Sequence, residues 1–148
     1  QSPSSAASDV YKRQDELIAA IHSGNYDAIV CNYANGDMVG HSGKLEPAIA
    51  AVETLDECLA RLEQAIEAVG GQMLVTADHG NVEQMRDPQN DQEHTAHTSN
   101  LVPLVYVGGQ RLNLRPRGSL CDVAPTLLQL MQLEVPPEMT GKTLIASS

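Results

Sequence analysis

The chain has 148 residues, the length of one ordinary domain and enough to bury a hydrophobic core. Its composition, 42% hydrophobic and 19% charged, is typical of a soluble globular protein. The formal net charge of −10 argues against nucleic acid or a membrane surface as a partner, and no apolar run approaches the roughly 18 residues needed to span a bilayer.

The cysteines and the first residues indicate the compartment. Cys31, Cys58 and Cys121 are odd in number and far apart, so we expect reduced thiols in a cytoplasmic protein rather than disulfides. Residues 1–14 lack the charge-then-apolar order of a secretory signal, and we expect a disordered tail or a segment not native to the domain. The folded domain is therefore expected to comprise residues 15–148.

The first predicted elements are short. A helical pattern covers residues 15–23 and ends at Gly24. Residues 27–33 form an apolar run bounded by polar residues, which predicts a buried parallel strand. The pair Asn35-Gly36 then predicts a turn.

The later elements alternate between helix and strand. Apolar residues recur every three or four positions over 45–69, which predicts an amphipathic helix that ends at the following glycines. Residues 72–76 and 101–107 predict buried strands, and the polar stretch 84–100 between them predicts a long loop. A last helix is expected from a cap at Asp122 to about Leu133. This order predicts an α/β fold with a mostly parallel sheet flanked by helices.

Three clusters of carboxylate and imidazole groups follow these elements: Asp37 with His41, Asp78 with His79, and His94 with His97. Asp37 and Asp78 each come just after a predicted strand. Since ligands bind beyond the carboxyl ends of parallel strands, both clusters are expected at the same edge of the sheet. Carboxylate and imidazole without thiolate suit Zn or Mn. Two such half-sites indicate a binuclear metal centre.

Simpler interpretations remain open for each cluster. Asp37 can form an Asx turn before a surface histidine, and Asp78 can be an ordinary residue at a strand end. Spacing does not decide between His94 and His97 as the ligand, and both could bind. Asn81 could orient a ligand or only close the turn. The nearby hydroxyl residues have no activating context and suit turn or capping roles; they are Ser42, Thr76, Thr95, Thr98 and Ser99.

Longer motifs in this order resemble one enzyme family. The matching segments are Asn32–Gly43, Thr76–Asp87, His94–Thr98, Val102–Gly108, Asp122–Leu128 and Pro137–Lys142. They closely resemble the C-terminal part of cofactor-independent (2,3-bisphosphoglycerate-independent) phosphoglycerate mutase, of the alkaline phosphatase superfamily. The resemblance covers the chain from about Asp15 to its end.

The resemblance implies an alkaline phosphatase-like fold of which the N-terminal part is missing. It also implies interconversion of 3-phosphoglycerate and 2-phosphoglycerate, in glycolysis and gluconeogenesis, through a phosphoserine. The family uses two Mn²⁺ ions, or other divalent metals such as Zn²⁺ or Co²⁺, and no bisphosphoglycerate. Its substrate is a small phosphorylated three-carbon acid, and full-length members are expected to be monomers.

The resemblance also assigns metal ligands. Asp37, His41 and His97 would bind one metal, and Asp78 with His79 would form part of the second site. It favours His97 over His94 as the ligand.

The chain departs from the family where the family supplies its nucleophile. The serine, an accompanying aspartate and the inserted domain with substrate-binding arginines have no counterpart here. We therefore expect the isolated chain to lack mutase activity and to expose apolar strand surface that lowers its stability. The rival interpretations are a phosphomonoester or sulfate-ester hydrolase of the same superfamily and a non-catalytic metal-binding module.

Overall fold

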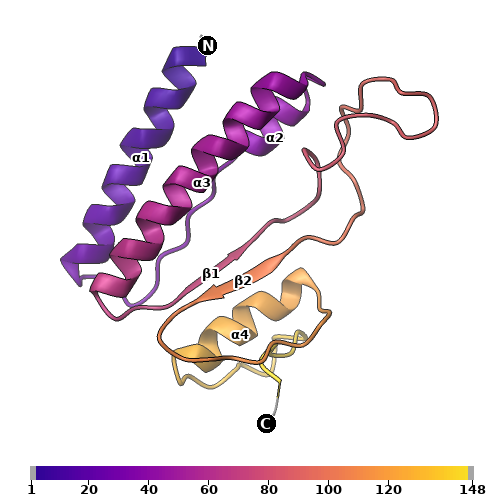
Figure 1. Cartoon of the computed structure of the whole chain (residues 1–148). Helices are drawn as coiled ribbons and strands as arrows, with labels where there is room; N and C mark the ends of the chain where they lie inside the picture. The colour runs from indigo at the N-terminus through magenta and orange to yellow at the C-terminus, as the bar shows by residue number, and fades with distance from the viewer. Residues whose placement is uncertain (1–2, 147–148) are drawn as a thin grey trace.

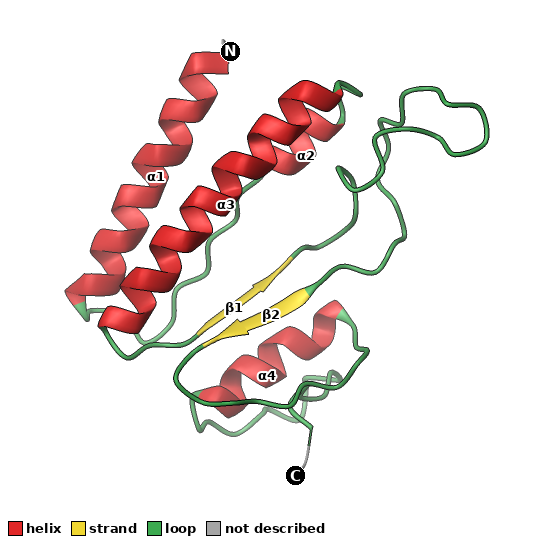
Figure 2. Cartoon of the chain, in the orientation of Figure 1, coloured by secondary structure: helices red, strands yellow, loops and turns green. Residues whose placement is uncertain are grey.

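The computed structural model describes residues 3–146, with side-chain environments from Val10 onward. Its elements in chain order are α1 (Pro3–Ser23), α2 (Asn35–Gly40), α3 (Leu45–Ala68), β1 (Met73–Thr76), β2 (Leu104–Val107), the 3₁₀ turn η1 (Leu120–Asp122) and α4 (Val123–Leu130). The long helices α1 and α3 run side by side, and the strands lie between them and α4 (Figures 1 and 2). The described residues thus form a small α/β structure with helices on both sides of the strands.

The two strands pair in an antiparallel manner, with Met73 opposite Val107 and Thr76 opposite Leu104. This is the one sheet among residues 3–146, and it differs from the mostly parallel sheet that the sequence predicted. The physical reason is the connection. No helix follows β1 to carry the chain back across the sheet, so the loop of residues 77–103 returns beside β1 in the opposite direction.

The strand predicted at residues 27–33 is wrong for this structure. The segment runs as an irregular connection from α1 to α2, and Ile29 and Val30 are 40% and 91% exposed. An apolar run becomes a strand only where a neighbour accepts its backbone hydrogen bonds. Among residues 3–146, no backbone group pairs with the backbone of residues 28–33. The expectation of exposed apolar surface is met here, while its effect on stability stays a prediction.

Helix α1 extends across most of the segment that was expected to be disordered. It begins at Pro3, and proline is favoured in a first helical turn. Gln14 is fully buried against α3, where its side-chain Nε2 donates to the Cys58 carbonyl at 2.9 Å. For residues 3–14 the expected disorder is therefore wrong, and residues 1–2 lie outside the described part. Whether the segment is native to the domain stays a prediction. The helix stops before Gly24, at φ 65°, as expected.

Helix α3 confirms the clearest prediction from the sequence. It was expected over residues 45–69 and is observed over Leu45–Ala68. Its buried residues recur at helical spacing; they are Ala48, Cys58, Leu62 and Ala65. Gly70, at φ 64°, supplies the left-handed residue that ends the helix. The bounds of this helix therefore follow from its apolar spacing and from the glycine after its last turn.

Two polar side chains at the junction of η1 and α4 attach the C-terminal segment of the chain to this part of the fold. The Asp122 carboxylate accepts from the backbone N–H groups of Ser119 at 2.9 Å and Lys142 at 2.7 Å. Thr126, fully buried, accepts from the Leu144 N–H at 2.8 Å. Asp122 was expected to cap the last helix, but its carboxylate caps the 3₁₀ turn instead, and α4 ends at Leu130 rather than near Leu133. These bonds attach the end of the chain to α4.

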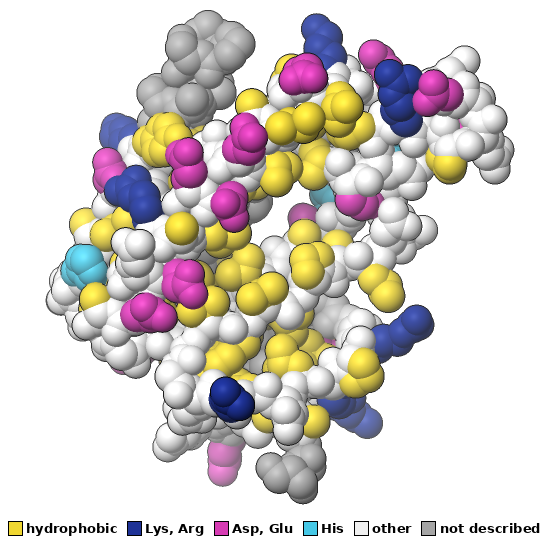
Figure 3. Space-filling view, viewed as in Figure 1, with side chains coloured by type: hydrophobic (Ala, Val, Ile, Leu, Met, Phe, Trp, Pro, Cys, Tyr) yellow, Lys and Arg dark blue, Asp and Glu magenta, His cyan; other side chains and the backbone are white. Residues whose placement is uncertain are grey.

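The surface carries exposed apolar residues and acidic charge. Figure 3 shows acidic side chains gathered over the helical layer and apolar side chains around the centre of this face. Val30, Leu101, Met38 and Tyr26 are the most exposed large hydrophobic residues among those described. Within residues 3–146, no helix combines the length and apolar character needed to cross a bilayer.

Candidate metal centre

Asp37 lies in α2, and His41 is the residue that follows its last helical position. Their spacing of four residues is one helical turn, so their side chains are neighbours. The Asp37 Oδ1 atom lies 3.1 Å from His41 Nε2. Whether these two residues bind one metal stays a prediction.

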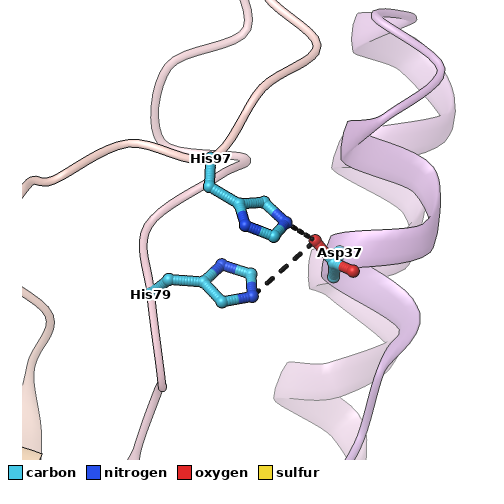
Figure 4. Close-up of side chains that lie close together, drawn as sticks. All are labelled: Asp37, His79 and His97. Carbon is cyan, nitrogen blue, oxygen red and sulfur yellow. Dashed lines mark hydrogen bonds and ion pairs between the residues drawn. The ribbon is translucent and has the colours of Figure 1, made fainter.

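Two histidines from opposite ends of the loop of residues 77–103 complete the cluster. His97, before β2, places Nε2 2.9 Å from Asp37 Oδ1, and His79, after β1, places Nε2 3.9 Å from the same oxygen (Figure 4). The rings of His79 and His97 stack, with centroids 3.6 Å apart. His41 Nε2 lies 3.1 Å from His97 Nε2. Three imidazoles therefore converge on one carboxylate oxygen of Asp37.

Backbone carbonyls orient two of the rings. The His41 Nδ1 atom lies 2.7 Å from the Thr95 carbonyl oxygen, and His79 Nδ1 lies 3.3 Å from the Gly80 carbonyl oxygen. A carbonyl can only accept, so each Nδ1 carries the hydrogen and donates it. In the neutral ring the lone pair then belongs to Nε2, which faces Asp37. This is the tautomer that leaves Nε2 free to bind a metal.

Asn81 orients the carboxylate. It is buried, and its Nδ2 donates to Asp37 Oδ1 at 2.8 Å. Burial acts to raise the pKa of Asp37, but the hydrogen bonds from Asn81 and His97, with His41 nearby, outweigh it and lower the pKa below the usual 3.8. Gly40 makes room for Asn81, because a Cβ at Gly40 would overlap the Asn81 amide. Of the two roles open for Asn81, the geometry favours the orienting one.

Asp78 lies at the edge of this cluster, and His94 lies outside it. The Asp78 side chain is 77% exposed, and its Oδ1 lies 3.6 Å from His79 Nε2. His94 is not among the clustered groups, and its buried Nε2 has no hydrogen-bond partner within residues 3–146. The geometry therefore groups His79 with Asp37 and His97, whereas the sequence assigned His79 to a second metal. The division into two metal sites stays a prediction.

Glu83 lies within the matching segment Thr76–Asp87, and the sequence assigned it no role. Its Oε2 accepts from the Asn81 N–H at 2.5 Å, and its Oε1 accepts from the Thr98 hydroxyl and from Asn100 Nδ2. These bonds, led by that from Thr98, lower the pKa of Glu83 below its usual value. The signal in the sequence that could have identified Glu83 is its place four residues after His79, in the loop that follows β1.

The nearby hydroxyl groups are engaged elsewhere or lack partners in the cluster. Ser42 donates to the Val39 carbonyl, Thr76 to the Pro103 carbonyl and Thr98 to Glu83. Ser42 has the turn role expected from the sequence, whereas Thr76 and Thr98 donate to residues distant in the chain. None of the three donates to a cluster histidine, so none has the base that activates a nucleophile.

The cluster fits a divalent metal by the chemistry of its donors. One carboxylate oxygen and imidazole Nε2 atoms are the ligands that suit Zn, Mn or Co. Ligands bound at about 2.1 Å around one ion are separated by roughly 3 to 3.5 Å, and the Asp37–His41 and His41–His97 separations are both 3.1 Å. The Nε2 lone pairs of His41 and His79 point inward, as such an ion requires.

A cavity of about 570 Å³ adjoins the cluster. Asp78 and His79 line one part of its wall, Thr98 and Ser99 another, and Arg117 lies on the C-terminal side. The cavity has room for a small organic acid, because ligand sites begin near 300 Å³.

Comparisons with known proteins agree with these motifs. A family model described as the Metalloenzyme superfamily matches residues 4–135. The 2,3-bisphosphoglycerate-independent phosphoglycerate mutase of Cronobacter sakazakii is 61% identical over 130 residues, which cover 88% of this chain and 25% of that protein. The mutase of Methylobacillus flagellatus is 61% identical over 137 residues, 92% of this chain and 26% of that protein.

A solved structure shares the fold. The Leishmania mexicana phosphoglycerate mutase, solved at low cobalt concentration, matches with a TM-score of 0.82 and 35% identity, over 91% of this chain and 28% of that one. This match confirms the alkaline phosphatase-like fold class of the prediction.

The chain spans about a quarter of the length of these relatives. The resemblance to cofactor-independent phosphoglycerate mutases that the motifs indicated is confirmed, and the family match includes residues 4–14. By the extent of that match, the chain belongs to the metalloenzyme superfamily.

Proposed function

We propose that this chain is the metal-binding C-terminal part of a cofactor-independent phosphoglycerate mutase. In the whole enzyme, 3-phosphoglycerate and 2-phosphoglycerate are interconverted through a phosphoserine, with two divalent ions, Mn²⁺ foremost, and without bisphosphoglycerate. The convergence of His41, His79 and His97 on one oxygen of Asp37 carries this proposal. The identity of about 60% to named mutases supports the substrate.

The residues of this chain hold and orient the ligands. Asp37 brings negative charge to the centre, Asn81 fixes its carboxylate, and the Thr95 and Gly80 carbonyls set the tautomers of His41 and His79. When bound there, a divalent metal supplies Lewis-acid stabilisation for a phosphoryl group. Asp78 and His79 are proposed to contribute to the second ion, with ligands outside these 148 residues.

The nucleophile is proposed to lie outside these 148 residues. Three of the hydroxyl groups near the cluster donate to other acceptors. The chain also has nine Lys and Arg residues but nineteen Asp and Glu residues. The positive charge that binds a phosphorylated acid is therefore proposed to come from bound metals and from residues outside this chain. The whole enzyme is proposed to be a cytoplasmic monomer that takes a small phosphorylated three-carbon acid.

Metal binding and turnover test this proposal separately. The 148-residue chain should bind Mn²⁺ and Co²⁺ in a calorimetric titration, and it should show no turnover of 3-phosphoglycerate with Mn²⁺ present. Absence of metal binding would contradict the proposed centre. Turnover by the chain alone would contradict the proposed location of the nucleophile.

The rival hydrolase function is tested on the longer gene product. Sequence upstream of this chain that encodes the inserted substrate-binding domain supports the mutase. Release of phosphate or sulfate from simple esters, without that insertion, would favour the hydrolase. A single metal with no catalytic partner encoded upstream would favour the non-catalytic module.

A further inference from the structure

Glu83 joins the two ends of the loop of residues 77–103, one of which carries His79 and the other His97. One carboxylate oxygen accepts from the Asn81 N–H, two residues after His79. The other accepts from the Thr98 hydroxyl and the Asn100 amide, just after His97. One side chain therefore connects the segment after β1 with the segment before β2.

The backbone under this carboxylate is closely packed. Gly80 and Thr98 form an isolated antiparallel bridge, in which the Thr98 N–H donates to the Gly80 carbonyl at 2.9 Å. A Cβ at Gly80 would overlap both the Thr98 hydroxyl and the Glu83 carboxylate. The two ends of the loop thus meet at one backbone hydrogen bond, with the carboxylate of Glu83 beside it.

This connection coincides with the stacking of two cluster histidines. His79 precedes Gly80 and His97 precedes Thr98, so the bridge brings both rings to the same side, with centroids 3.6 Å apart. Glu83 itself makes no hydrogen bond to Asp37 or to a cluster histidine among residues 3–146. Its effect on the cluster must therefore pass through the loop.

We propose that Glu83 is a positioning residue that fixes the separation of His79 and His97 and so prepares the cluster for a divalent metal. This inference rests on the proposed function for the metal, but the geometry it assigns is a property of the chain alone. Outer partners of metal ligands change metal affinity by about 10- to 100-fold when they are removed.

An ionised carboxylate is required for this role. Three donors face its two oxygens, and a carboxylate offers only acceptors. In a Glu83→Gln variant, one oxygen becomes an NH₂ group, which faces an N–H or O–H donor in either orientation. The substitution keeps the shape of the side chain and breaks at least one bond between the two ends of the loop.

The test compares Glu83→Gln with Glu63→Gln, an exposed glutamate on α3 that lies far from this loop in sequence. Cobalt titration followed by visible absorption measures affinity and ligand geometry. Glu83→Gln should weaken Co²⁺ binding by about 10- to 100-fold and alter the absorption bands. Glu63→Gln should match the unsubstituted chain. Equal affinity and equal spectra for Glu83→Gln would overturn the proposal.

A metal-free measurement separates this inference from the proposed function. NMR of the apo chain reports the ring protons of His79 and His97, whose shifts depend on stacking. Glu83→Gln should move both sets of signals, and unchanged signals would overturn the positioning role. If the unsubstituted chain bound no Co²⁺ while these signals moved, the metal function would fail and the positioning of the rings would stand.

A milder pair of substitutions guards against loss of folding. Thr98→Ser keeps the hydroxyl that donates to Glu83, and Thr98→Val removes it at similar volume. Thr98→Ser should retain the affinity and ring signals, and Thr98→Val should reproduce the Glu83→Gln effect. Equal behaviour of the two variants would count against a role for this hydrogen bond.

Discussion

Two aspartates of this molecule sit among several hydrogen-bond donors but differ in what those donors are. Asp122 accepts from the backbone N–H groups of Ser119 and Lys142 and faces Arg115 at 3.7 Å. Asp37 accepts from one side-chain amide and faces three imidazoles. Backbone donors cannot leave without unfolding, whereas imidazole Nε2 atoms can bind a metal instead. The comparison distinguishes Asp122, whose carboxylate stabilises the fold, from Asp37, whose carboxylate lies among side chains that can bind a metal.

The largest expected effect is on metal binding when Asp37 is replaced. Asp37→Asn removes the charged oxygen shared by the cluster, so Mn²⁺ affinity should fall by more than about 100-fold, beyond the range for an outer partner. Calorimetric titration measures the affinity. Asp122→Asn is the matched control and should bind Mn²⁺ as the unsubstituted chain does, at a temperature where both are folded.

The reverse contrast is expected for thermal stability. Asp122→Asn places an amide NH₂ group against one of two backbone donors, so the metal-free variant should have a lower Tm than Asp37→Asn. Differential scanning calorimetry without metal measures both. A lower Tm for Asp37→Asn than for Asp122→Asn would contradict the assignment of the structural role to Asp122.

Thr126 tests the same junction of η1 and α4 through a buried hydroxyl. Thr126→Val removes the acceptor for the buried Leu144 N–H, at almost equal volume. An unsatisfied buried donor should lower the free energy of unfolding by about 1 to 3 kcal/mol. Urea denaturation measures the change. Thr126→Ser retains the hydroxyl and should lose clearly less, and equal losses would show that the methyl group rather than the hydrogen bond matters.

Asn81 gives a smaller effect at the metal-binding carboxylate. Asn81→Ala removes the amide that donates to Asp37, so the carboxylate is less well oriented, and Mn²⁺ affinity should fall by about 10-fold. Calorimetric titration beside Asp37→Asn measures the ratio. A loss as large as that of Asp37→Asn would mean that Asn81 does more than orient the carboxylate.

The smallest effect is the pH dependence at Asp122. Backbone N–H donors of Lys142 and Ser119, with Arg115 nearby, hold the pKa of this carboxyl below its usual 3.8, and the Cys121 thiol is the other titratable group that contacts it. Because the folded pKa is lowered, the stabilisation is present above the unfolded value and is lost as the pH falls through the folded value. The Tm difference between the unsubstituted chain and Asp122→Asn should therefore shrink below about pH 4. A constant difference would contradict the ionised role.

The elements that sequence predicted well carry their own signals. Residues 45–68 combine a repeated apolar spacing with a glycine stop, so the helix needs little from the rest of the chain. Residues 27–33 show the opposite case. Their apolar run indicates burial, but a strand needs a partner for its backbone, and none of the described residues supplies one.

The candidate site divides in a similar way. The types and spacing of Asp37, His41, Asp78 and His79 predicted carboxylate and imidazole ligands at the ends of elements. Only the family resemblance favoured His97 over His94. Spacing did not reveal that His79 lies with Asp37 and His97, while Asp78 faces solvent. Nor did it reveal that Asn81 and Glu83 hold those residues, because a polar loop residue carries no periodic signal.

The sequence by itself therefore determined the long helix α3 and the family, and it indicated the donor chemistry of the centre, since these depend on residue type and on spacing along the chain. The tertiary structure decided the antiparallel pairing of β1 with β2, the burial of Gln14, and which imidazoles meet at Asp37. The reason is physical: each of these depends on contacts between residues far apart in the chain, and local patterns do not encode which distant groups will meet.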